Sequence, residues 1–305
     1  MKKYDLGALS KNQVIYHRGE RRVRRVLRRF QSLFRFSGAF AFSVCSAVNF
    51  EEIAISLKNS TVPDLGMLAV TLVLPAYNEA EKLEDTVNKT IDALKNITDS
   101  FEIILAEDGS TDGTDKIAEA LAKKYRFVEH FHSDCRLGRG GSLKRAFEKS
   151  TGNVLAYIDV DLSTDMSHLK ELIDAVSVED FDIATGSRML PESNVKRPIK
   201  RSIASACFNA LIRLLLKSRL YDHQCGFKSF KRESLFKLID DIEDEGWFWD
   251  TELLVLAQKR RYRVKEFPVR WRQCASTRVN LISDVTGMGR QIIRMWLQRR
   301  RNDEP

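Results

Sequence analysis

A chain of 305 residues, of which 43% are hydrophobic and 30% are charged, can build one large or two modest globular domains. Its scarce glycine and proline, 15 and 6 residues, exclude a collagen-like or a disordered chain. No uncharged apolar stretch reaches the about 18 residues that a membrane-spanning helix requires, which argues against a spanning segment.

The formal net charge of +8 is concentrated at the N-terminus. Residues 1–66 hold 12 Lys and Arg against 5 Asp and Glu, whereas the remaining 239 residues hold 38 against 37. The basic excess therefore belongs to an N-terminal extension and not to the body of the protein. For the body we expect no nucleic-acid partner.

This N-terminal extension combines an arginine-rich run, residues 21–30, with 15 uncharged residues, 36–50. Fifteen residues are too few to cross a bilayer core of about 30 Å as a helix. Two interpretations carry equal weight: an interfacial segment attracted to anionic lipid, and a loosely structured extension outside the functional protein. The second interpretation is based on Met67, a possible start of translation directly before the first predicted strand. A signal peptide is disfavoured because the apolar part starts late.

Neither the cysteines nor the set His132, His168 and His223 shows the spacing of a metal site. The five cysteines are widely separated and form no C-x-x-C pair, so we expect reduced, mostly packed thiols in a cytosolic setting. For His132, His168 and His223 we expect surface or structural roles.

From residue 69 onward the pattern is typical of a parallel sheet covered by helices. Apolar runs rich in β-formers at 70–74, 101–105, 154–158 and 182–184 alternate with segments of helical periodicity. The apolar faces of three predicted helices are formed by Leu83, Val87, Ile91 and Leu94, by Ile117 and Leu121, and by Leu169, Leu172, Ile173 and Val176. We expect one α/β domain over residues 67–280.

Polar and acidic residues follow three of the predicted strands, at 75–79, 107–112 and 159–161. Ligands in such sheets bind beyond the carboxyl ends of the strands, so these residues predict one shared site. For Asp112 and Asp115, capping and turn roles are the better interpretation. Asp159 and Asp161 leave a buried strand on the same side and would repel each other unless a divalent cation joined them. Hard oxygen ligands favour Mg2+ or Mn2+.

Several ordered motifs together resemble the inverting family 2 glycosyltransferases of GT-A fold, over about residues 68–280. More narrowly, they resemble the dolichyl-phosphate (polyprenyl-phosphate) β-glucosyltransferases and mannosyltransferases. The fold implied is a Rossmann-like, mostly parallel sheet flanked by helices, here with basic amphipathic N- and C-terminal extensions. The motifs are LPAYNE at 74–79, EDGSTD at 107–112, GRGG at 138–141, DVDL at 159–162, GSR at 186–188, DHQCGFK at 222–228, WDTE at 249–252 and STRV at 276–279.

The resemblance implies two groups of binding residues. Those for the nucleotide sugar are Pro75, Ala76, Tyr77, Asn78, Glu79, Glu107, Asp108, Arg139, Asp159 and Val160. Those for the metal ion are Asp159 and Asp161. Glu107 stands where Asp is commoner, and Ser163 stands where many mannosyl members place a metal-binding Gln. The second departure leaves the third protein ligand of the metal open and favours UDP-glucose over GDP-mannose as the donor.

The chemistry of such a transfer needs charge stabilisation, because the leaving nucleoside diphosphate gains negative charge. We expect Asp161 to act through the metal, and Arg188 and Arg201 to bind phosphate oxygens. For Arg201 a solvated basic loop is equally compatible with the sequence. Arg272 and Arg278, after a predicted strand at 264–271, are candidates to clamp an acceptor phosphate, although Arg272 also fits an exposed strand end. For Glu252 we expect contact with the sugar or with an arginine.

The C-terminal residues 281–305 predict a helix with an apolar stripe between arginines. That composition suits a helix in a membrane interface, where a polyprenyl acceptor is reached. A helix docked on the body, or a dimer contact, is the alternative.

The function expected from the resemblance is transfer of a hexose from UDP-glucose or GDP-mannose to dolichyl or polyprenyl phosphate. It would take place at the cytoplasmic face of a membrane, with the protein peripherally attached. One alternative is transfer to a hydroxyl of a saccharide or other acceptor, with Asp250 or Glu252 as the base. Another is a non-enzymatic membrane or nucleic-acid binder that uses the basic N-terminus.

Overall fold

A seven-stranded sheet lies at the centre of the computed structural model, which describes residues 69–273 and 281–303, with side chains at 69–273 and 287–300. The strands of this sheet are β1 (Val70–Ala76), β2 (Phe101–Glu107), β3 (Val128–Phe131), β4 (Val154–Ile158), β5 (Ile183–Ser187), β7 (Phe227–Lys231) and β8 (Val264–Pro268). Two further strands, β6 (Asn194–Lys196) and β9 (Arg270–Arg272), form a small sheet of their own.

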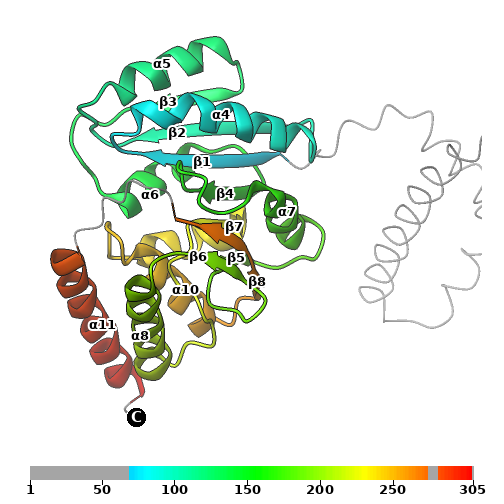
Figure 1. Cartoon of the computed structure of the whole chain (residues 1–305). Helices are drawn as coiled ribbons and strands as arrows, with labels where there is room; N and C mark the ends of the chain where they lie inside the picture. The colour runs from blue at the N-terminus through cyan, green and yellow to red at the C-terminus, as the bar shows by residue number, and fades with distance from the viewer. Residues whose placement is uncertain (1–68, 274–280, 304–305) are drawn as a thin grey trace, which may run out of the picture. The chain divides into compact units, whose positions relative to one another are not determined.

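Helices cover the sheet and connect its strands (Figure 1). The α-helices are α4 (Ala80–Lys95), α5 (Thr114–Lys124), α6 (Arg139–Lys149), α7 (Leu169–Ser177), α8 (Ile199–Leu216), α9 (Arg232–Phe236), α10 (Trp249–Lys259) and α11 (Leu281–Asp303). Two short 3-10 helices, η1 (Met166–His168) and η2 (Ile239–Asp241), complete the described elements.

The strand order is β3-β2-β1-β4-β7-β5-β8, in which only β7 runs antiparallel to its neighbours. The carboxyl ends of β1, β2, β4, β5 and β8 therefore meet at one edge of the sheet. Because β7 is reversed, its first residue, Phe227, pairs with Ile158 at the end of β4. The residues before Phe227 consequently reach the same edge as those after Ile158.

Alternating side chains of the strands supply two hydrophobic cores, one on each face of the sheet. Leu72 and Leu74 of β1 pack with the apolar faces of α4, α5 and α7, whereas Val73 packs with α6 and α10 on the other face. All of the predicted helix-face residues belong to the first core, Ile117 as a partly buried member. The sheet is buried on both sides, as the uninterrupted apolar runs predict.

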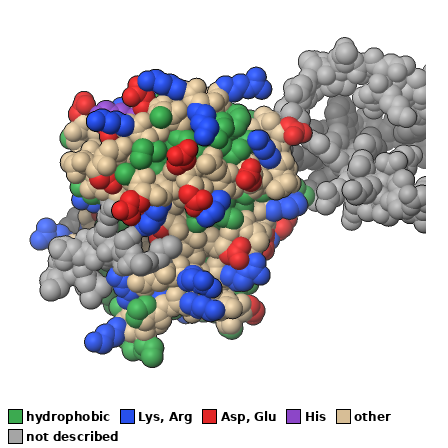
Figure 2. Space-filling view, turned by 45° about the horizontal axis from the view of Figure 1, so that its top comes forward, with side chains coloured by type: hydrophobic (Ala, Val, Ile, Leu, Met, Phe, Trp, Pro, Cys, Tyr) green, Lys and Arg blue, Asp and Glu red, His purple; other side chains and the backbone are tan. Residues whose placement is uncertain are grey.

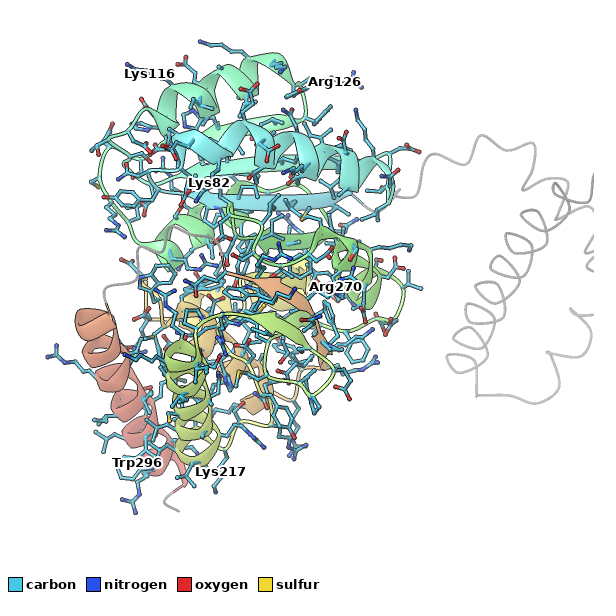
Figure 3. All side chains as sticks on the ribbon, viewed as in Figure 1. Lys82, Lys116, Arg126, Lys217, Arg270 and Trp296 are labelled. Atoms are coloured by element: carbon cyan, nitrogen blue, oxygen red, sulfur yellow. The ribbon has the colours of Figure 1, made fainter. Side chains whose placement is uncertain are left out.

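A third, smaller apolar cluster joins α8, α10 and α11 at one end of the protein. Its buried members include Ile212 of α8, Val255 of α10, and Ile292 and Met295 of α11. The helices α8 and α11 run side by side (Figure 1), and the labelled Trp296 and Lys217 mark the same end of this pair in Figure 3. The C-terminal helix is therefore docked on the body, one of the two alternatives that its sequence left open.

The predicted strands are present at the expected positions, with one correction. The predicted strand 264–271 is broken into β8 and β9, which pair with β5 and β6 respectively. Pro268 has no N–H to donate, and after it the chain exchanges one partner strand for the other. The predicted alternation of β-rich runs with helices, and thus a mostly parallel sheet flanked by helices, is confirmed.

Other expectations concern exposure, charge and membrane crossing. Of the three cysteines in the described residues, Cys225 is buried but Cys135 and Cys207 are exposed, so the expectation of mostly packed thiols is wrong for these two.

Basic and acidic side chains are interleaved on the face shown in Figure 2. Within residues 69–273 and 281–303, no helix combines the length and the apolarity needed to cross a bilayer. The predicted N-terminal extension lies outside the described residues.

Gly152 lies in the turn that precedes β4 and packs closely against the start of β1. A Cβ atom at this position would lie 2.5 Å from the backbone nitrogen of Thr71 and 2.7 Å from the carbonyl oxygen of Ala69. Because these are backbone atoms of a paired strand, we expect Gly152→Ala to lower the free energy of unfolding by about 1–3 kcal/mol, measured by urea denaturation. The matched control is Gly287→Ala in α11.

Gly287 is exposed and a Cβ there would have nothing within 4 Å, so this control variant should gain about 0.5–1 kcal/mol from helix propensity. Equal effects of the two substitutions would contradict the packing described for Gly152.

Candidate functional site

The loop after β1 and the loop after β2 hold each other in place. Asn78 has a left-handed backbone, φ 55°, and its side-chain oxygen accepts a hydrogen bond from the N–H of Thr111 at 2.7 Å. The N–H of Asn78 donates to Ser110 Oγ at 2.8 Å, and that of Glu79 donates to Thr114 Oγ1 at 2.8 Å. Two of the predicted nucleotide-sugar segments, 75–79 and 107–112, are thus one connected structure.

Tyr77 presents its ring to a cation in this region. The guanidinium of Arg136 lies 4.1 Å from the ring centroid, within range of a cation–π interaction. Asp112 accepts hydrogen bonds from Ala80 and Thr114, so the expected capping role of this aspartate is confirmed.

Asp108 anchors the loop that leads into α6. Its two carboxylate oxygens accept hydrogen bonds from the N–H groups of Leu137, at 2.6 Å, and Gly138, at 3.1 Å. Burial raises the pKa of Asp108, and these two N–H groups oppose that rise. The carboxylate of Asp108 therefore already orders the loop before α6. A nucleotide at the predicted position would contact this same carboxylate.

Four of the predicted nucleotide-sugar residues are buried, namely Asp108, described above, and Ala76, Val160 and Glu107. The side chains of Ala76 and Val160 belong to the first core, and their carbonyl oxygens accept from the N–H of Asp108 and the hydroxyl of Thr86. Glu107 is 2% exposed and its carboxylate contacts His132 and the N–H of Ser110. Pro75 lies in β1, partly buried, so it too is part of the strand and not of the loop.

The glycines of the GRGG motif allow α6 to start very close to the segment before α10. Gly138 has φ 86°, and a Cβ there would lie 2.6 Å from the carbonyl oxygen of Glu245. At Gly140 a Cβ would lie 2.6 Å from the ring of Trp249. This close approach directs Arg139, between the two glycines, toward the carboxyl ends of the strands.

Arg139 bridges two aspartates. Its Nη2 atom lies 2.7 Å from Asp159 Oδ1, and its Nε atom lies 3.4 Å from Asp250 Oδ2. The guanidinium also lies 5.3 Å from the ring of Tyr157 and 5.5 Å from that of Trp247. Although burial opposes the charge, Asp159 and Asp250 together raise the pKa of Arg139.

Asp250 is held on its other side by a fully buried lysine. Lys228 is 0% exposed, and its Nζ atom donates to Asp250 at 3.0 Å, to Tyr157 at 3.1 Å and to the carbonyl oxygen of Cys225 at 2.7 Å. The hydroxyl of Tyr157 donates to the same aspartate, and burial raises the pKa of Tyr157. We call Asp159, whose side chain is 34% exposed, and the more deeply placed Arg139, Asp250, Lys228 and Tyr157 the buried charge network.

Asp159 and Asp161 follow β4 and are close enough for Asp161 to act on the pKa of Asp159. Burial raises the pKa of Asp159 and the neighbouring Asp161 adds to the rise, whereas Arg139 lowers it. Gly226 lies directly against Asp159, because a Cβ there would fall 2.0 Å from Oδ2. The hydroxyl of Ser163, two residues after Asp161, is buried without a hydrogen-bond partner.

Arg188 follows β5 and forms a bidentate ion pair with a buried aspartate, Asp222. Its Nε and Nη2 atoms lie 2.7 and 2.8 Å from the two oxygens of Asp222, which is 0% exposed. Arg188 keeps the pKa of Asp222 far below its usual range, despite burial. The guanidinium also lies 5.7 Å from the ring of Trp271.

Arg197, in the basic segment 196–201, is not among the predicted site residues. Its guanidinium donates to the hydroxyls of Ser202 and Ser205 on α8. Burial lowers the pKa of Arg197, and the nearby cations Arg188 and Arg201 lower it further. Three guanidinium groups are thus gathered beside the strand ends. The signal available in the sequence was the spacing of the two serines, one helical turn apart.

The remaining predicted catalytic residues lie apart from this centre or outside the described residues. Arg272 is exposed at the end of β9, which agrees with the alternative of a strand-end charge. Glu252 is 2% exposed and contacts Arg294 of α11 at 2.7 Å, so it binds an arginine of the C-terminal helix. Arg278 lies outside the described residues. Three consecutive aromatic residues lie at the start of α10: Phe248 and Trp249 are buried, and Trp247 is 38% exposed.

His223 in the DHQCGFK motif is a buried structural residue. Its Nδ1 atom lies 2.7 Å from Asn209 Oδ1, and its Nε2 atom lies 2.7 Å from Ser218 Oγ. Burial lowers the pKa of His223 to about 4 and raises the pKa of the adjacent Cys225 to about 12. Both side chains are therefore uncharged at neutral pH.

The lowered pKa of His223 predicts a loss of stability in mild acid. Between pH 6.5 and about 4 the unfolded chain binds a proton at His223 that the folded chain does not bind. The free energy of unfolding should fall through this window by up to about 3 kcal/mol on account of this residue. Urea unfolding at a series of pH values checks it. His223→Gln should show a shallower pH slope, and an unchanged slope would contradict the assignment.

Removing the ammonium group of Lys228 should be strongly destabilising, because Asp250 would keep a buried charge with one cation fewer. We expect Lys228→Met to lose about 3–5 kcal/mol of unfolding free energy in urea titrations. The matched control is Lys144→Met, which breaks a surface pair with Asp240 and should cost less than about 1 kcal/mol. Similar losses in both variants would refute the importance of the buried charge network. Adding Asp250→Asn to Lys228→Met should recover part of the loss.

Comparison with solved structures shows the same fold in sugar transferases. The crystal structure of glucosyl-3-phosphoglycerate synthase from Mycobacterium tuberculosis with Mn2+, UDP and glucosyl-3-phosphoglycerate has a TM-score of 0.56 and 20% sequence identity. The match covers 83% of this chain and 84% of that chain.

Comparison of sequences extends the similarity to named relatives. Glycosyltransferase AglD of Haloferax volcanii is 52% identical over 231 residues, which are 75% of this chain but only 37% of AglD. Dolichyl-phosphate beta-glucosyltransferase is 28% identical in Saccharomyces cerevisiae and 30% in Dictyostelium discoideum, over 73% of each of these two relatives and 73% and 74% of this chain. The family described as "Glycosyl transferase family 2" matches residues 71–238. With its fold, its paired aspartates and this match, the chain belongs to glycosyltransferase family 2 and is a glycosyltransferase.

Proposed function

We propose that this enzyme transfers a hexose, with glucose favoured, from a nucleotide sugar to a polyprenyl or dolichyl phosphate. One observation carries the proposal: Asp159 and Asp161 follow β4 and Arg188 follows β5 at the same edge of the sheet, and Arg188 and Arg201 are near enough to Arg197 to lower its pKa. A transfer between two phosphate-bearing substrates needs one site for a cation and another for anions. The sheet edge supplies both kinds of charge.

The residues at this edge fit a bound Mg2+ or Mn2+ ion. Asp159 and Asp161 offer carboxylate oxygens, the ligands that these ions prefer, and Ser163 adds a buried hydroxyl that has no other partner. Burial is the main cause of the raised pKa of Asp159, and the nearby Asp161 adds to it; a bound cation would oppose both effects. Such an ion would supply charge stabilisation to the leaving diphosphate. The solved synthase structures from Mycobacterium tuberculosis hold Mn2+ or Mg2+ with UDP.

The arginines would position the phosphate groups. Arg188 is oriented by Asp222, and Arg197 by two serine hydroxyls, so both guanidinium groups are held in fixed directions. A phosphate acceptor is already an anion near neutral pH and needs no strong general base. Correct placement by cations is therefore the main contribution that the protein would make to the acceptor.

A hydroxyl acceptor is less well supported, because such an acceptor needs a carboxylate base. Asp250 accepts from Lys228 and Tyr157 and lies against Arg139, and Glu252 is paired with Arg294. Both carboxylates are already committed to cations inside the protein. A purely non-enzymatic binder does not agree with membership of a glycosyltransferase family.

The donor and the acceptor are proposed from the relatives. The names of several curated relatives state a dolichyl-phosphate β-glucosyltransferase activity, and one solved synthase structure holds UDP-glucose with glycerol 3-phosphate. We therefore favour UDP-glucose over GDP-mannose. The chain spans 37% of AglD, so the activity of that longer protein is not transferred to it.

Contact with a membrane surface would bring a polyprenyl acceptor to the site. Apolar side chains on α8 and α11 are exposed, among them Ile199, Ile203 and Leu214, and Ile293 and Leu297. Apolar side chains among arginines and lysines suit a helix pair at a lipid interface. We place this contact at the cytoplasmic face, where the nucleotide sugar would be available.

The test is a transfer assay with the full chain, Mg2+ or Mn2+, and a short polyprenyl phosphate, in which UDP-glucose and GDP-mannose are offered separately. We expect lipid-linked glucose from UDP-glucose, and a loss of at least about a hundredfold in Asp161→Ala, because the charge on the leaving diphosphate would lose its main stabilising partner. Product formation is measured by extraction of the lipid.

The matched control is Asp165→Ala, an aspartate in the same segment that pairs with Arg270 at 2.9 Å and should leave turnover near the wild-type rate. Donor consumption with no lipid product would overturn the acceptor, and consumption of GDP-mannose alone would overturn the donor.

A further inference from the structure

A glutamate and two histidines meet at the outer end of the sheet, away from the paired aspartates in sequence and in strand order. Glu107 ends β2, and His130 and His132 lie on the edge strand β3 and directly after it. The register pairs Leu105 with His130, so the residues two positions further along, Glu107 and His132, are also neighbours. All three side chains therefore project from the same face of the sheet.

The ligand atoms of these residues are close together. One carboxylate oxygen of Glu107 and one ring nitrogen from each histidine all lie within 4.8 Å of one another. Of the residues that the structure describes, this is the one group of three or more such side chains that meets that limit. Ligand atoms on a tetrahedral Zn2+ ion are about 3–3.5 Å apart, so small side-chain rotations would suffice.

The hydrogen bonds around the cluster leave one nitrogen unsatisfied. Glu107 Oε2 lies 2.5 Å from His132 Nδ1, and Glu107 Oε1 accepts from the N–H of Ser110 at 2.5 Å. The Nε2 atom of His130 is buried and has no hydrogen-bond partner. A buried polar atom without a partner is unusual in a native protein and points to a missing ligand.

An acidic side chain also stands behind one of the histidines. The Nε2 atom of His132 lies 3.3 Å from Asp134 Oδ1, on the side of the ring opposite the nitrogen that faces Glu107. A metal-bound histidine commonly donates its second ring N–H to a carboxylate, which fixes the ring orientation. Asp134 occupies the position of such an outer partner.

We propose that Glu107, His130 and His132 form a binding site for a divalent cation that prefers nitrogen ligands, with Zn2+ as the representative ion. Two imidazoles and one carboxylate are a ligand set that binds zinc and leaves a fourth position for water. The site differs in chemistry from the paired aspartates, whose oxygen ligands suit Mg2+ or Mn2+.

The protonation of the two rings is compatible with this site. Burial lowers the pKa of His130, so that this ring is neutral at pH 7 and can ligate. The hydrogen bond with Glu107 raises the pKa of His132, and a bound cation would take the place of that proton. Carboxylates of Asp115 and Glu119 also act on His130, and that of Asp134 on His132, which adds negative charge around the ion.

A cation bound by Glu107, His130 and His132 would stabilise the loops after β1 and β2. Glu107 Oε1 accepts a hydrogen bond from the N–H of Ser110, and Ser110 Oγ accepts one from the N–H of Asn78. The ion would join the edge strand β3 to the start of this chain of contacts. The expected effect is structural, a stiffer loop after β2, and it does not depend on which sugar or acceptor the enzyme uses.

The experiment uses the full 305-residue chain. The protein is stripped with a chelator and then titrated with ZnCl2 in a calorimeter, with millimolar Mg2+ present to occupy oxygen-ligand sites. We expect one equivalent of Zn2+ to bind and the melting temperature to rise. His130→Ala and His132→Ala should each weaken binding by more than the roughly tenfold to hundredfold typical of lost outer partners. Co2+ substitution should give the weak visible bands of nitrogen and oxygen ligation.

Three control variants identify the source of any zinc that binds. Asp161→Ala removes a paired aspartate, Cys135→Ser removes an exposed thiol three residues from His132, and His168→Gln removes a histidine outside the cluster. All three should keep the tight equivalent. Since His132 is 46% exposed, His132→Ala should fold even if His130→Ala does not, and circular dichroism checks both.

Two results would overturn the proposal. One is the absence of any tight equivalent of Zn2+ in the folded wild-type chain, which would make Glu107 and His132 an ion pair only. The other is wild-type zinc affinity in both folded histidine variants, or loss of the equivalent in Cys135→Ser or Asp161→Ala, which would assign the zinc elsewhere.

Discussion

The arrangement of the site depends on how the protein keeps several charges out of water at the strand ends. Arg139 lies between Asp159 and Asp250, and the fully buried Lys228 completes the neutralisation of Asp250. Desolvation of each ion costs several kcal/mol, so no member can be lost without exposing the others to an uncompensated charge. This mutual dependence fixes the direction of Asp159. It also explains why Gly226 must be small, since any side chain there would displace that carboxylate.

The fold was predictable because its signals are local and repeated. The strand Val154–Ile158 has the predicted bounds, and the helix-face residues of α4 and α7 are buried as their spacing requires. The paired aspartates were predictable as well, because alternate residues after a buried strand share a side. The break between β8 and β9 was not predicted, since it depends on two different partner strands, β5 and β6, that lie far from it in the sequence.

The partners of the charged residues could not be inferred from the sequence. Arg188 was expected to be available for a phosphate, but Asp222, 34 residues away, holds two of its nitrogens. For Glu252 the sequence left the sugar and an arginine as alternatives, and the structure pairs it with Arg294, 42 residues away, a partner that no motif indicated. Arg197 looked like one cation in a solvated run until α8 brought its two serines beside it. Motif order identifies which residues gather at the sheet edge, whereas pairing among them is decided by the three-dimensional packing.

The contact between α10 and α11 has a consequence for how the C-terminal helix communicates with the rest of the enzyme. Glu252 is two residues from Asp250 on the same helix, and it is almost completely buried beneath Arg294. If α11 detached, the carboxylate of Glu252 would remain inside the protein without its cation, on the same helix that carries Asp250 of the buried charge network. The free energy of docking α11 is therefore shared with the free energy of ordering α10. A ligand of α11 would act on the strand-end charges through this linkage only to the extent that its affinity differs between the docked and the detached helix.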